Sequence, residues 1–191
     1  LKIITEVTSG NIYQHLMLSR KVTTLVLILE KHGTEPVRRV LLGMKKRGFG
    51  VGKWNGFGGK VESNETVMEG AVRELHEECG ITPVGLRETG LLAFDFPDGS
   101  CCPLLVRVFV ASEYEGDITE SEEMRPQWFD TTDIPFGEMW EDDHLWFPMI
   151  LSNTPRPFVG TFVFKEVHTM IEHTVSELRE DQSFDELART I

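Results

Sequence analysis

The sequence is most informative at residues 59–81, which read GKVESNETVMEGAVRELHEECGI. Thr66 followed three residues later by Glu69 forms a capping box, so we expect a helix to begin there. Glu69 is also spaced to form an i,i+4 ion pair with Arg73. Gly80 is a natural residue to end the helix. At about 100° per residue, one face of this helix is apolar and should dock on a core. The residues of this face are Met68, Ala71, Val72, Leu75 and Cys79.

Three carboxylates, Glu74, Glu77 and Glu78, lie beside this apolar face, and Gly70 shares their side of the helix. Like charges four residues apart weaken a helix by roughly 0.2–0.5 kcal/mol, and an interior glycine costs about 0.5–1 kcal/mol. A divalent cation on the carboxylates would remove the repulsion, and the glycine would leave room for a ligand beside the backbone. Three glutamates alone are more typical of a solvated acidic face, so the whole stretch has to separate the two interpretations.

The spacing of the whole stretch is specific. It has Gly, five residues, Glu, seven residues, Arg-Glu-Leu, one residue, Glu-Glu, one residue and Gly-Ile. This string resembles the Nudix box and departs from it at no defining position. The resemblance implies a loop–helix–loop that holds Mg²⁺ on its glutamates and hydrolyses a nucleoside diphosphate linked to another group. It also implies a single-domain α/β protein with the Nudix fold, a mixed β-sheet in an α/β/α sandwich.

Composition narrows the class of protein. The chain of 191 residues fits one domain, and 40% apolar and 26% charged residues are typical of a soluble globular protein. Its apolar runs have the length of strands, so we expect no membrane association. The three cysteines are Cys79 and the adjacent pair Cys101 and Cys102, a set that indicates a reducing compartment without disulfides. We therefore expect a cytoplasmic protein, and the sequence leaves a nuclear or mitochondrial fraction open.

Charge is unevenly distributed along the chain. The net charge of −12 argues against stable binding to nucleic acid, which usually needs a basic face. Residues 36–61 nevertheless contain seven basic residues and no acid, whereas residues 111–143 contain twelve acids and only Arg125 to oppose them. The basic stretch could attract a polyphosphate, although it also fits a basic pair of surface strands. We expect a small-molecule nucleotide as the partner and a monomer as the working unit.

Hydrophobic patterns predict the remaining elements. Helical spacing of aromatic residues predicts a helix over 140–151, and residues 169–178 fit either a strand or a helix. The alternation of strands and helices favours a mixed sheet with helices on both faces. The predicted strands cover residues 24–29, 38–46, 55–61, 86–96, 104–110, 125–129 and 158–164.

The chain divides into three parts. Residues 1–16 form a loose N-terminal extension, upstream of an alternative start at Met17. Residues 17–178 form the Nudix hydrolase domain. Residues 179–191 form a polar C-terminal tail that fits a frayed helix. Neither a repeat nor a linker to a second domain is evident.

Four segments outside the box resemble one Nudix subfamily, the MutT-like oxidised purine nucleoside triphosphatases, or 8-oxo-dGTPases. These segments are residues 41–50, 54–61, 123–126 and 139–148. The resemblance implies an Mg²⁺-dependent pyrophosphohydrolase, with Mn²⁺ as a substitute ion. It would convert 8-oxo-dGTP and 2-hydroxy-dATP to the monophosphate and pyrophosphate, which removes mutagenic nucleotides from the pool.

The resemblance assigns the chemistry to five positions. Carboxylate oxygens are the ligands that Mg²⁺ prefers, and the ion would polarise the phosphate and help to generate hydroxide. Glu77, Glu78 and Glu123 remain alternative general bases. The implied metal ligands are the carbonyl of Gly58 and the carboxylates of Glu74, Glu77, Glu78 and Glu123.

The resemblance also implies a pocket for a purine base, which needs aromatic walls and a few polar groups. The implied walls and entrance are Phe49, Phe94, Trp140 and Trp146, with Thr24 and Lys45. The other expected substrate contacts are Asn55, Phe57, Gly58, Gly59, Lys60, Glu141, Asp142 and Asp143. Phe57 also fits a role in core packing.

Asn55 and the adjacent pair Asp142 and Asp143 would read the polar edge of the base. An amide offers both a donor and an acceptor. If both aspartates face the pocket, their protons are coupled, so that one can stay neutral and donate while the other accepts. Such a pair alone is more often surface charge, but the neighbouring Trp140 and Trp146 favour the pocket.

Some positions differ from the subfamily pattern. Leu104 stands where a pocket methionine is frequent, Glu141 replaces a proline, and the loop after residue 29 is longer. These differences bear on the fine substrate preference and not on the reaction. Two alternatives stay open beside the oxidised purine nucleoside triphosphatase: a Nudix enzyme for another nucleoside diphosphate derivative, and a catalytically silent nucleotide-binding module. Loss of box glutamates would favour the silent module, but Glu74, Glu77 and Glu78 are all present.

Overall fold

The structure is a computed structural model that describes residues 20–31, 33, 35–152 and 154–191. The expected extension over residues 1–16 and the alternative start at Met17 lie outside these ranges. Within them, no helix combines the length and the apolar character that crossing a membrane requires.

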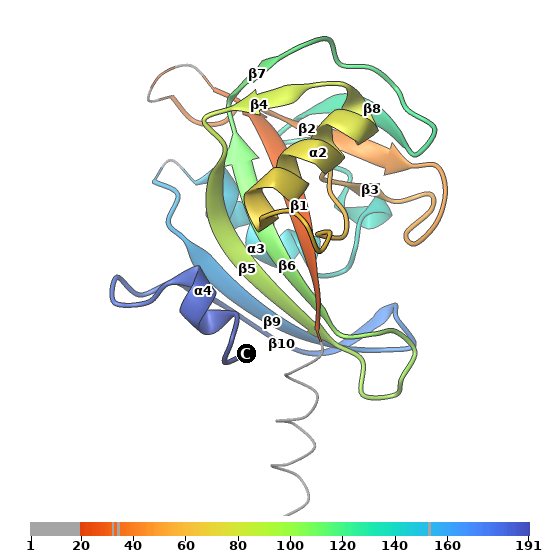
Figure 1. The fold of residues 1–191 in the computed structure, drawn as a ribbon, viewed down its shortest axis with the longest axis vertical. Helices are drawn as coiled ribbons and strands as arrows, with labels where there is room; N and C mark the ends of the chain where they lie inside the picture. Colours follow the sequence, from red (N-terminus) through yellow and green to blue (C-terminus); the bar gives the residue numbers. More distant parts are fainter. Residues whose placement is uncertain (1–19, 32, 34, 153) are drawn as a thin grey trace, which may run out of the picture.

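A mixed sheet forms the centre of the molecule (Figure 1). In the described part of the chain it has eight strands in the order β10-β9-β5-β6-β1-β2-β3, with β8 paired to β2. The pairs β1·β6 and β5·β9 are parallel and the others antiparallel. The strands are β1 (Lys21–Glu30), β2 (Arg39–Lys45), β3 (Trp54–Asn55), β5 (Arg87–Asp95), β6 (Leu104–Ala111), β8 (Met124–Asp130), β9 (Phe158–Lys165) and β10 (Thr169–Glu177). A separate two-stranded sheet pairs β4 (Thr82–Val84) with β7 (Glu113–Glu115).

Helices cover both faces of the large sheet. Helix α2 (Val67–Cys79) lies in front of the sheet in Figure 1 and α3 (Asp143–Leu151) behind it. Strand β1 packs against both helical layers, because its successive side chains point to opposite faces of the sheet. Val26 packs in one core cluster with Leu75 of α2, whereas Leu25 and Leu27 pack in another with Trp146 of α3. The expected α/β/α sandwich is confirmed.

Local signals set the ends of α2 as expected. Thr66 Oγ1 accepts from the Glu69 backbone N–H, the Glu69 carboxylate accepts from the Thr66 N–H, and Gly80 closes the helix at φ 79°. The buried face differs from the expectation at two positions. Met68 is 41% exposed and Val72 is only half-buried, whereas Val67 packs against the core cluster beneath the helix. The buried residues of α2 are Gly70, Ala71, Leu75, Glu78 and Cys79.

The strand expected at residues 55–61 is shorter than predicted. Regular pairing stops after Asn55, and the following glycine-rich loop is attached to β1 by isolated bridges at Phe57 and Lys60. Residues 140–151 form a helix only from Asp143 onward, after the 3-10 turn η1 (Phe136–Glu138). Residues 169–178 resolve to a strand, β10.

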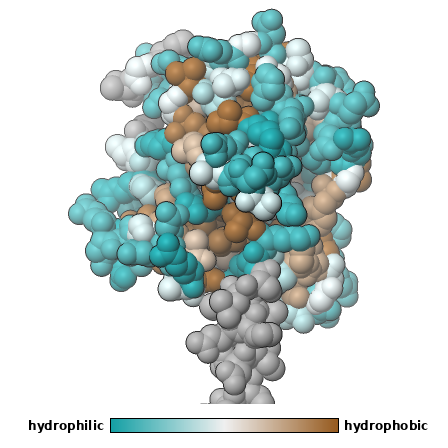
Figure 2. All heavy atoms as spheres, viewed as in Figure 1, coloured by the Kyte–Doolittle hydropathy of each residue, from teal (hydrophilic) through white to brown (hydrophobic). Residues whose placement is uncertain are grey.

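The segment expected as a polar tail contributes apolar packing. Residues 179–191 contain the short helix α4 (Phe184–Leu187), on the same face of the sheet as α2. Figure 2 shows hydrophobic residues between α2 and α4 on this face, flanked by hydrophilic ones. Charged residues lie between the apolar residues of this segment in the sequence, so residues 179–191 have the composition of a polar tail. The packed residues of the segment are Phe184, Leu187, Ala188 and Ile191, and their partners are Leu91, Ala93 and Leu105.

The capping box gives a test of how α2 is stabilised. Thr66→Ala removes the side-chain acceptor of the Glu69 N–H and should lower the free energy of unfolding by about 1 kcal/mol in urea titration. The exposed Thr132 supplies the control, since Thr132→Ala should stay within about 0.5 kcal/mol of the parent. Equal values for the two variants would show that the cap does not stabilise the helix.

Candidate functional site

A cavity of about 520 Å³ opens between the sheet and α3. Strand β1, the loop after β3, strands β5 and β6 and the residues before α3 all contribute to its wall. The site residues expected from sequence that line it are Thr24, Lys45, Phe49, Asn55, Gly58, Gly59, Phe94, Glu123, Trp140, Asp142, Asp143 and Trp146. Positions from six separate segments therefore meet in one hollow.

Aromatic rings form one end of the cavity. Phe49 and Trp140 stack with ring centroids 5.0 Å apart and an interplanar angle of 20°. Phe94 stacks on Phe162 of the neighbouring strand at 5.2 Å. Trp146 is fully buried at the base of the cavity. Flat apolar surfaces of this kind suit a planar ligand.

The two adjacent aspartates are buried at the same end. Asp142 is 3% exposed and accepts a 2.9 Å hydrogen bond from Trp146 Nε1. Asp143 is 2% exposed and accepts a 3.0 Å bond from the Trp140 backbone N–H. Burial raises the pKa of Asp142 to about 6. Burial, followed by repulsion from Asp142, raises the pKa of Asp143 well above its usual range. The pair therefore holds a proton more firmly on Asp143 than on Asp142, so that one carboxyl can donate to a ligand while the other accepts.

Asn55 extends this polar edge. Its Oδ1 accepts a 2.9 Å hydrogen bond from the Gly56 N–H. The amide NH₂ group is thus the part of Asn55 that can donate into the cavity.

The other end of the cavity is a glycine loop packed against α2. A Cβ at Gly58 would lie 2.1 Å from the Thr24 carbonyl oxygen, and one at Gly59 would lie 2.6 Å from the Glu74 carboxyl carbon. The absence of side chains at both positions allows the loop to approach β1 and α2 together. The Gly58 N–H donates a 2.8 Å bond to Glu78 Oε2 and so joins the loop to the helix.

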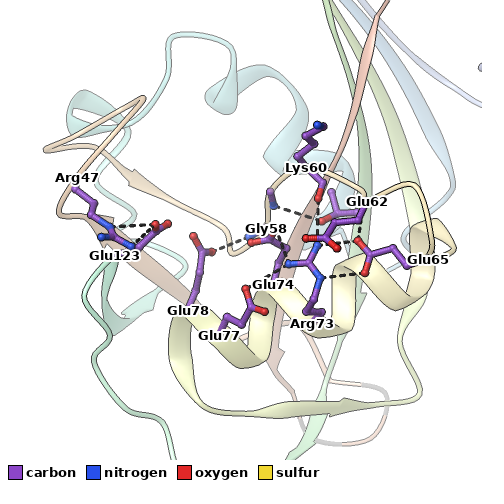
Figure 3. Close-up of polar contacts among 12 residues, drawn as sticks. Arg47, Gly58, Lys60, Glu62, Glu65, Arg73, Glu74, Glu77, Glu78 and Glu123 are labelled. Carbon is purple, nitrogen blue, oxygen red and sulfur yellow. Dashed lines mark hydrogen bonds and ion pairs between the residues drawn. The ribbon is translucent and has the colours of Figure 1, made fainter.

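Carboxylate side chains beside this loop form ion pairs with lysine and arginine side chains (Figure 3). Lys45 Nζ lies 2.9 Å from Glu78 Oε1 and 3.2 Å from Glu123 Oε2, so one ammonium joins two acids from different elements. Glu123 also accepts from Arg47 at 2.7 Å. Burial lowers the pKa of Lys45, but the charges and hydrogen bonds of Glu78 and Glu123 outweigh it and raise that pKa overall.

Arg73 organises the remaining acids of the box. Its guanidinium lies 2.7 Å from Glu65, 3.0 Å from Glu74 and 3.3 Å from Glu77. The hydrogen bonds from Arg73 lower the pKa of Glu65 to about 2. The expected pair of Arg73 with Glu69 is therefore replaced by these contacts, because Glu69 caps the helix instead.

Gly70 serves a different partner from the one expected. A Cβ there would lie 2.9 Å from Glu65 Oε1, so the glycine makes room for the carboxylate that holds Arg73 rather than for a ligand.

The four acids of the site, Glu74, Glu77, Glu78 and Glu123, differ in their burial and in their ion pairs. Burial raises the pKa of Glu78 against the opposing effect of Lys45, and it raises the pKa of Glu74 against that of Arg73. At Glu123 the hydrogen bond from Lys45 is the largest effect and lowers the pKa. Glu77 is 58% exposed at its side chain and faces solvent. The site therefore combines the poorly solvated acids Glu74 and Glu78 with Glu123, whose carboxylate stays ionised more readily.

The acids are candidate ligands for a divalent cation. Among the described residues, no group of three or more His, Cys, Asp or Glu side chains converges closely enough to hold a metal ion. The acids are divided instead between the ammonium of Lys45 and the guanidinium of Arg73. The donor set still suits a hard cation, since it consists of carboxylate oxygens and already encloses one positive charge between Glu78 and Glu123.

Three expected substrate contacts lie outside the cavity, and the structure corrects them. Phe57 pairs its backbone with Val26 and turns its ring into the fully buried cluster beneath α2. The side chain of Lys60 is exposed and extends away from the glutamates in Figure 3. Glu141 is exposed and accepts a 2.9 Å bond from the Met170 N–H.

Sequence reasoning missed several cavity residues that come from the strand pair β5 and β9 and the turn after β9. Alternating apolar positions in the predicted strands were the available signal, but the parallel pairing of β5 with β9 could not be foreseen. The missed residues are Leu92, Phe96, Phe164 and Val167.

The buried aspartates give a prediction for stability against pH. The folded-state pKa of Asp142 lies above its ordinary value of 3.8, so the folded protein binds this proton more tightly than the unfolded chain. Its contribution to stability is fully present below that ordinary value and is lost as the pH rises through about 6. Urea unfolding between acid and neutral pH should show this loss, and Asp142→Asn should reduce it by about 2 kcal/mol.

The exposed Asp133 provides the control, because Asp133→Asn makes the same chemical change on the surface and away from the cavity. An unchanged pH dependence in Asp142→Asn would mean that the pKa of Asp142 does not differ between the folded and the unfolded protein.

Comparisons with known proteins agree with this geometry. The model of the NUDIX domain matches residues 19–149. An oxidized purine nucleoside triphosphate hydrolase from Danio rerio is 48% identical over 164 residues, which cover 86% of this chain and 99% of the relative. The protein of that name from Mus musculus is 46% identical over 162 residues, which cover 85% of this chain and 98% of the relative.

A solved structure gives the fold alone. The MutT protein from Bacillus halodurans has a TM-score of 0.70 to this chain at 24% identity, and the match covers 82% of this chain and 97% of that protein. The matched domain includes the complete box, and both hydrolases align over nearly their full length. The chain belongs to the Nudix family.

Proposed function

We propose that this protein is a pyrophosphohydrolase for oxidised purine nucleoside triphosphates. The products are the nucleoside monophosphate and pyrophosphate, and the substrates include 8-oxo-dGTP and 2-hydroxy-dATP. One observation carries this proposal: a single cavity contains an aromatic end with two buried aspartates and an end formed by the glycine loop and Glu123. A nucleotide bound along this cavity would have its base at the aromatic end and its phosphates at the end formed by the glycine loop.

The relatives support the same substrate class. Two proteins that align over nearly their whole length with this chain are named oxidized purine nucleoside triphosphate hydrolases. A more distant relative from Proteus vulgaris, 31% identical over 96 residues, is named 8-oxo-dGTP diphosphatase.

The base end offers donors where an oxidised purine needs them. Oxidation adds oxygen and changes which edge positions donate and accept. Asp143, whose pKa is raised well above its usual range, supplies a carboxyl that can donate, Asp142, with a pKa of about 6, supplies one that can accept, and Asn55 supplies an amide. A site that leaves such buried groups unpaired with the wrong base rejects it strongly.

The phosphate end fits a divalent cation, and Nudix hydrolases generally need one, typically Mg²⁺. We propose Glu74, Glu77, Glu78, Glu123 and the Gly58 carbonyl as its ligands, with Mn²⁺ as a substitute. The bound ion supplies charge neutralisation and a more acidic water. The side chains of Lys45 and Arg47 line the same end of the cavity and can face the phosphates. Glu77, Glu78 and Glu123 are the candidate general bases.

The free thiols of Cys79, Cys101 and Cys102 fit a reducing compartment, and we propose the cytoplasm. That the enzyme works as a monomer stays a prediction.

Glu78→Gln tests the catalytic assignment. The variant keeps an acceptor for the Gly58 N–H but loses the charge that a cation needs, so kcat should fall by about 100-fold or more. Binding of the product 8-oxo-dGMP, measured by calorimetry, should change little. Glu113→Gln, at an exposed position on β7, should behave as the parent. Full activity in Glu78→Gln would refute the assignment of this carboxylate.

A panel of 8-oxo-dGTP, 2-hydroxy-dATP, dGTP and ADP-ribose with Mg²⁺ tests the substrate. The two oxidised nucleotides should have the highest kcat/KM. Asp142→Asn or Asp143→Asn should change the ratio of oxidised to normal nucleotide hydrolysis by about tenfold, since each replaces a titratable carboxyl at the base edge by an amide whose donor and acceptor are fixed. Preference for ADP-ribose would contradict the proposed substrate, and an unchanged ratio in both variants would remove the aspartates from base recognition.

A further inference from the structure

The turn between β9 and β10 carries unusual backbone strain. Glu166 and Val167 have φ values of 55° and 66°, and they are the non-glycine residues with positive φ in the described part of the chain. A β-branched residue such as valine rarely adopts this conformation, which costs about 1–3 kcal/mol. Such strain persists only where the surroundings over-determine the backbone. We call residues 166–170 the strap.

Two acids outside the strap hold it in place. Asp98, in the loop between β5 and β6, accepts a 2.7 Å hydrogen bond from the Glu166 N–H through Oδ2. This bond is the largest cause of the lowered pKa of Asp98. At the other end of the strap, the Met170 N–H donates to Glu141 Oε2 at 2.9 Å. Glu141 directly follows Trp140, so the second anchor ties the strap to the aromatic end of the cavity.

The strap contacts the cavity through one side chain and the cavity wall through another. Val167 lines the cavity directly. His168 stacks on Trp140 with centroids 6.0 Å apart and an interplanar angle of 14°. Phe49 also stacks on Trp140, and a Cβ at Gly50 would lie 3.0 Å from the same indole. The orientation of the Trp140 ring is therefore set by residues that converge from the turn between β9 and β10 and from the loop after β2.

We infer that His168 is a positioning residue for purine binding, and that Glu141 and Asp98 anchor the strap that carries it. His168 acts through Trp140: it holds the indole parallel to the plane in which a base stacks. Val167 closes the neighbouring part of the cavity. The role in purine binding rests on the proposed function, whereas the positioning of the indole does not. Glu141 thus contributes to the site as an anchor rather than as a substrate contact.

Steady-state kinetics with 8-oxo-dGTP test the inference. His168→Ala should raise KM about three- to tenfold, in line with the strength of one aromatic pair, while kcat stays close to that of the parent. His168→Phe restores a stacking ring and should return KM toward the parent value. The matched control is His173→Ala. His173 is exposed and lies on the same hairpin, but it stacks on Phe162 and not on Trp140.

The anchor is tested by a double-mutant cycle. Glu141→Ala should raise KM in the same direction, since it releases the Met170 N–H and with it the strap. Adding His168→Ala to Glu141→Ala should produce less than the product of the two effects, because both variants lose the same stacked arrangement. Fully multiplicative effects would overturn the role of Glu141 as an anchor of His168.

A second readout needs no substrate. Acrylamide quenching of Trp140, taken as the difference between each protein and its Trp140→Phe counterpart, should increase in His168→Ala and not in His173→Ala. Unchanged quenching together with unchanged KM would overturn the inference. If the parent protein fails to hydrolyse 8-oxo-dGTP, the proposed function fails, and the quenching measurement still decides whether His168 positions the indole.

Discussion

The hydrogen bond from the Gly58 N–H to the buried carboxylate of Glu78 is the contact on which the site depends. It joins the glycine loop to α2, and the same carboxylate receives the ammonium of Lys45 from β2 at 2.9 Å. Helix, loop and strand therefore meet at one group that is 3% exposed. Glu78 can hold this position because Leu75 and Cys79 bury the neighbouring face of α2 and because Gly58 fits against Thr24 where no other residue would.

The sheet places recognition and chemistry in one cavity although they belong to different layers of the sandwich. Strand β1 alternates, so Val26 supports α2 and its carboxylates while Leu25 lines the cavity on the α3 side. The glycine loop passes from one layer to the other at Gly58 and Gly59. In the proposed binding mode, a nucleotide along this path would have its base under α3 and its phosphates beside α2.

Local signals in the sequence were sufficient for α2. Its capping box, its terminal glycine and its glutamates follow from residues close in the chain, and so does the pairing of β5 with β6 across a short loop. The aromatic and acidic end was predicted from the resemblance to the subfamily, since the aspartate pair alone is more typical of surface charge.

The failures involve contacts between distant segments. Arg73 prefers Glu65 to Glu69 because the loop before α2 folds back over the helix, which i,i+4 spacing cannot show. Phe57 faces the core because its backbone pairs with Val26, and a register shift of one residue reverses a side chain. Glu141 anchors a strap whose partner, Met170, is remote in the sequence.

Lys45 lies between Glu78 and Glu123, where we propose that a divalent cation binds. The most direct test is the anomalous scattering of Mn²⁺ in crystals that also contain 8-oxo-dGMP. We expect a peak enclosed by the carboxylates of Glu74, Glu78 and Glu123, with the ammonium of Lys45 moved away from Glu78. Nucleotide bound in the cavity with Lys45 still between Glu78 and Glu123, and the manganese peak elsewhere, would contradict the assignment of this site.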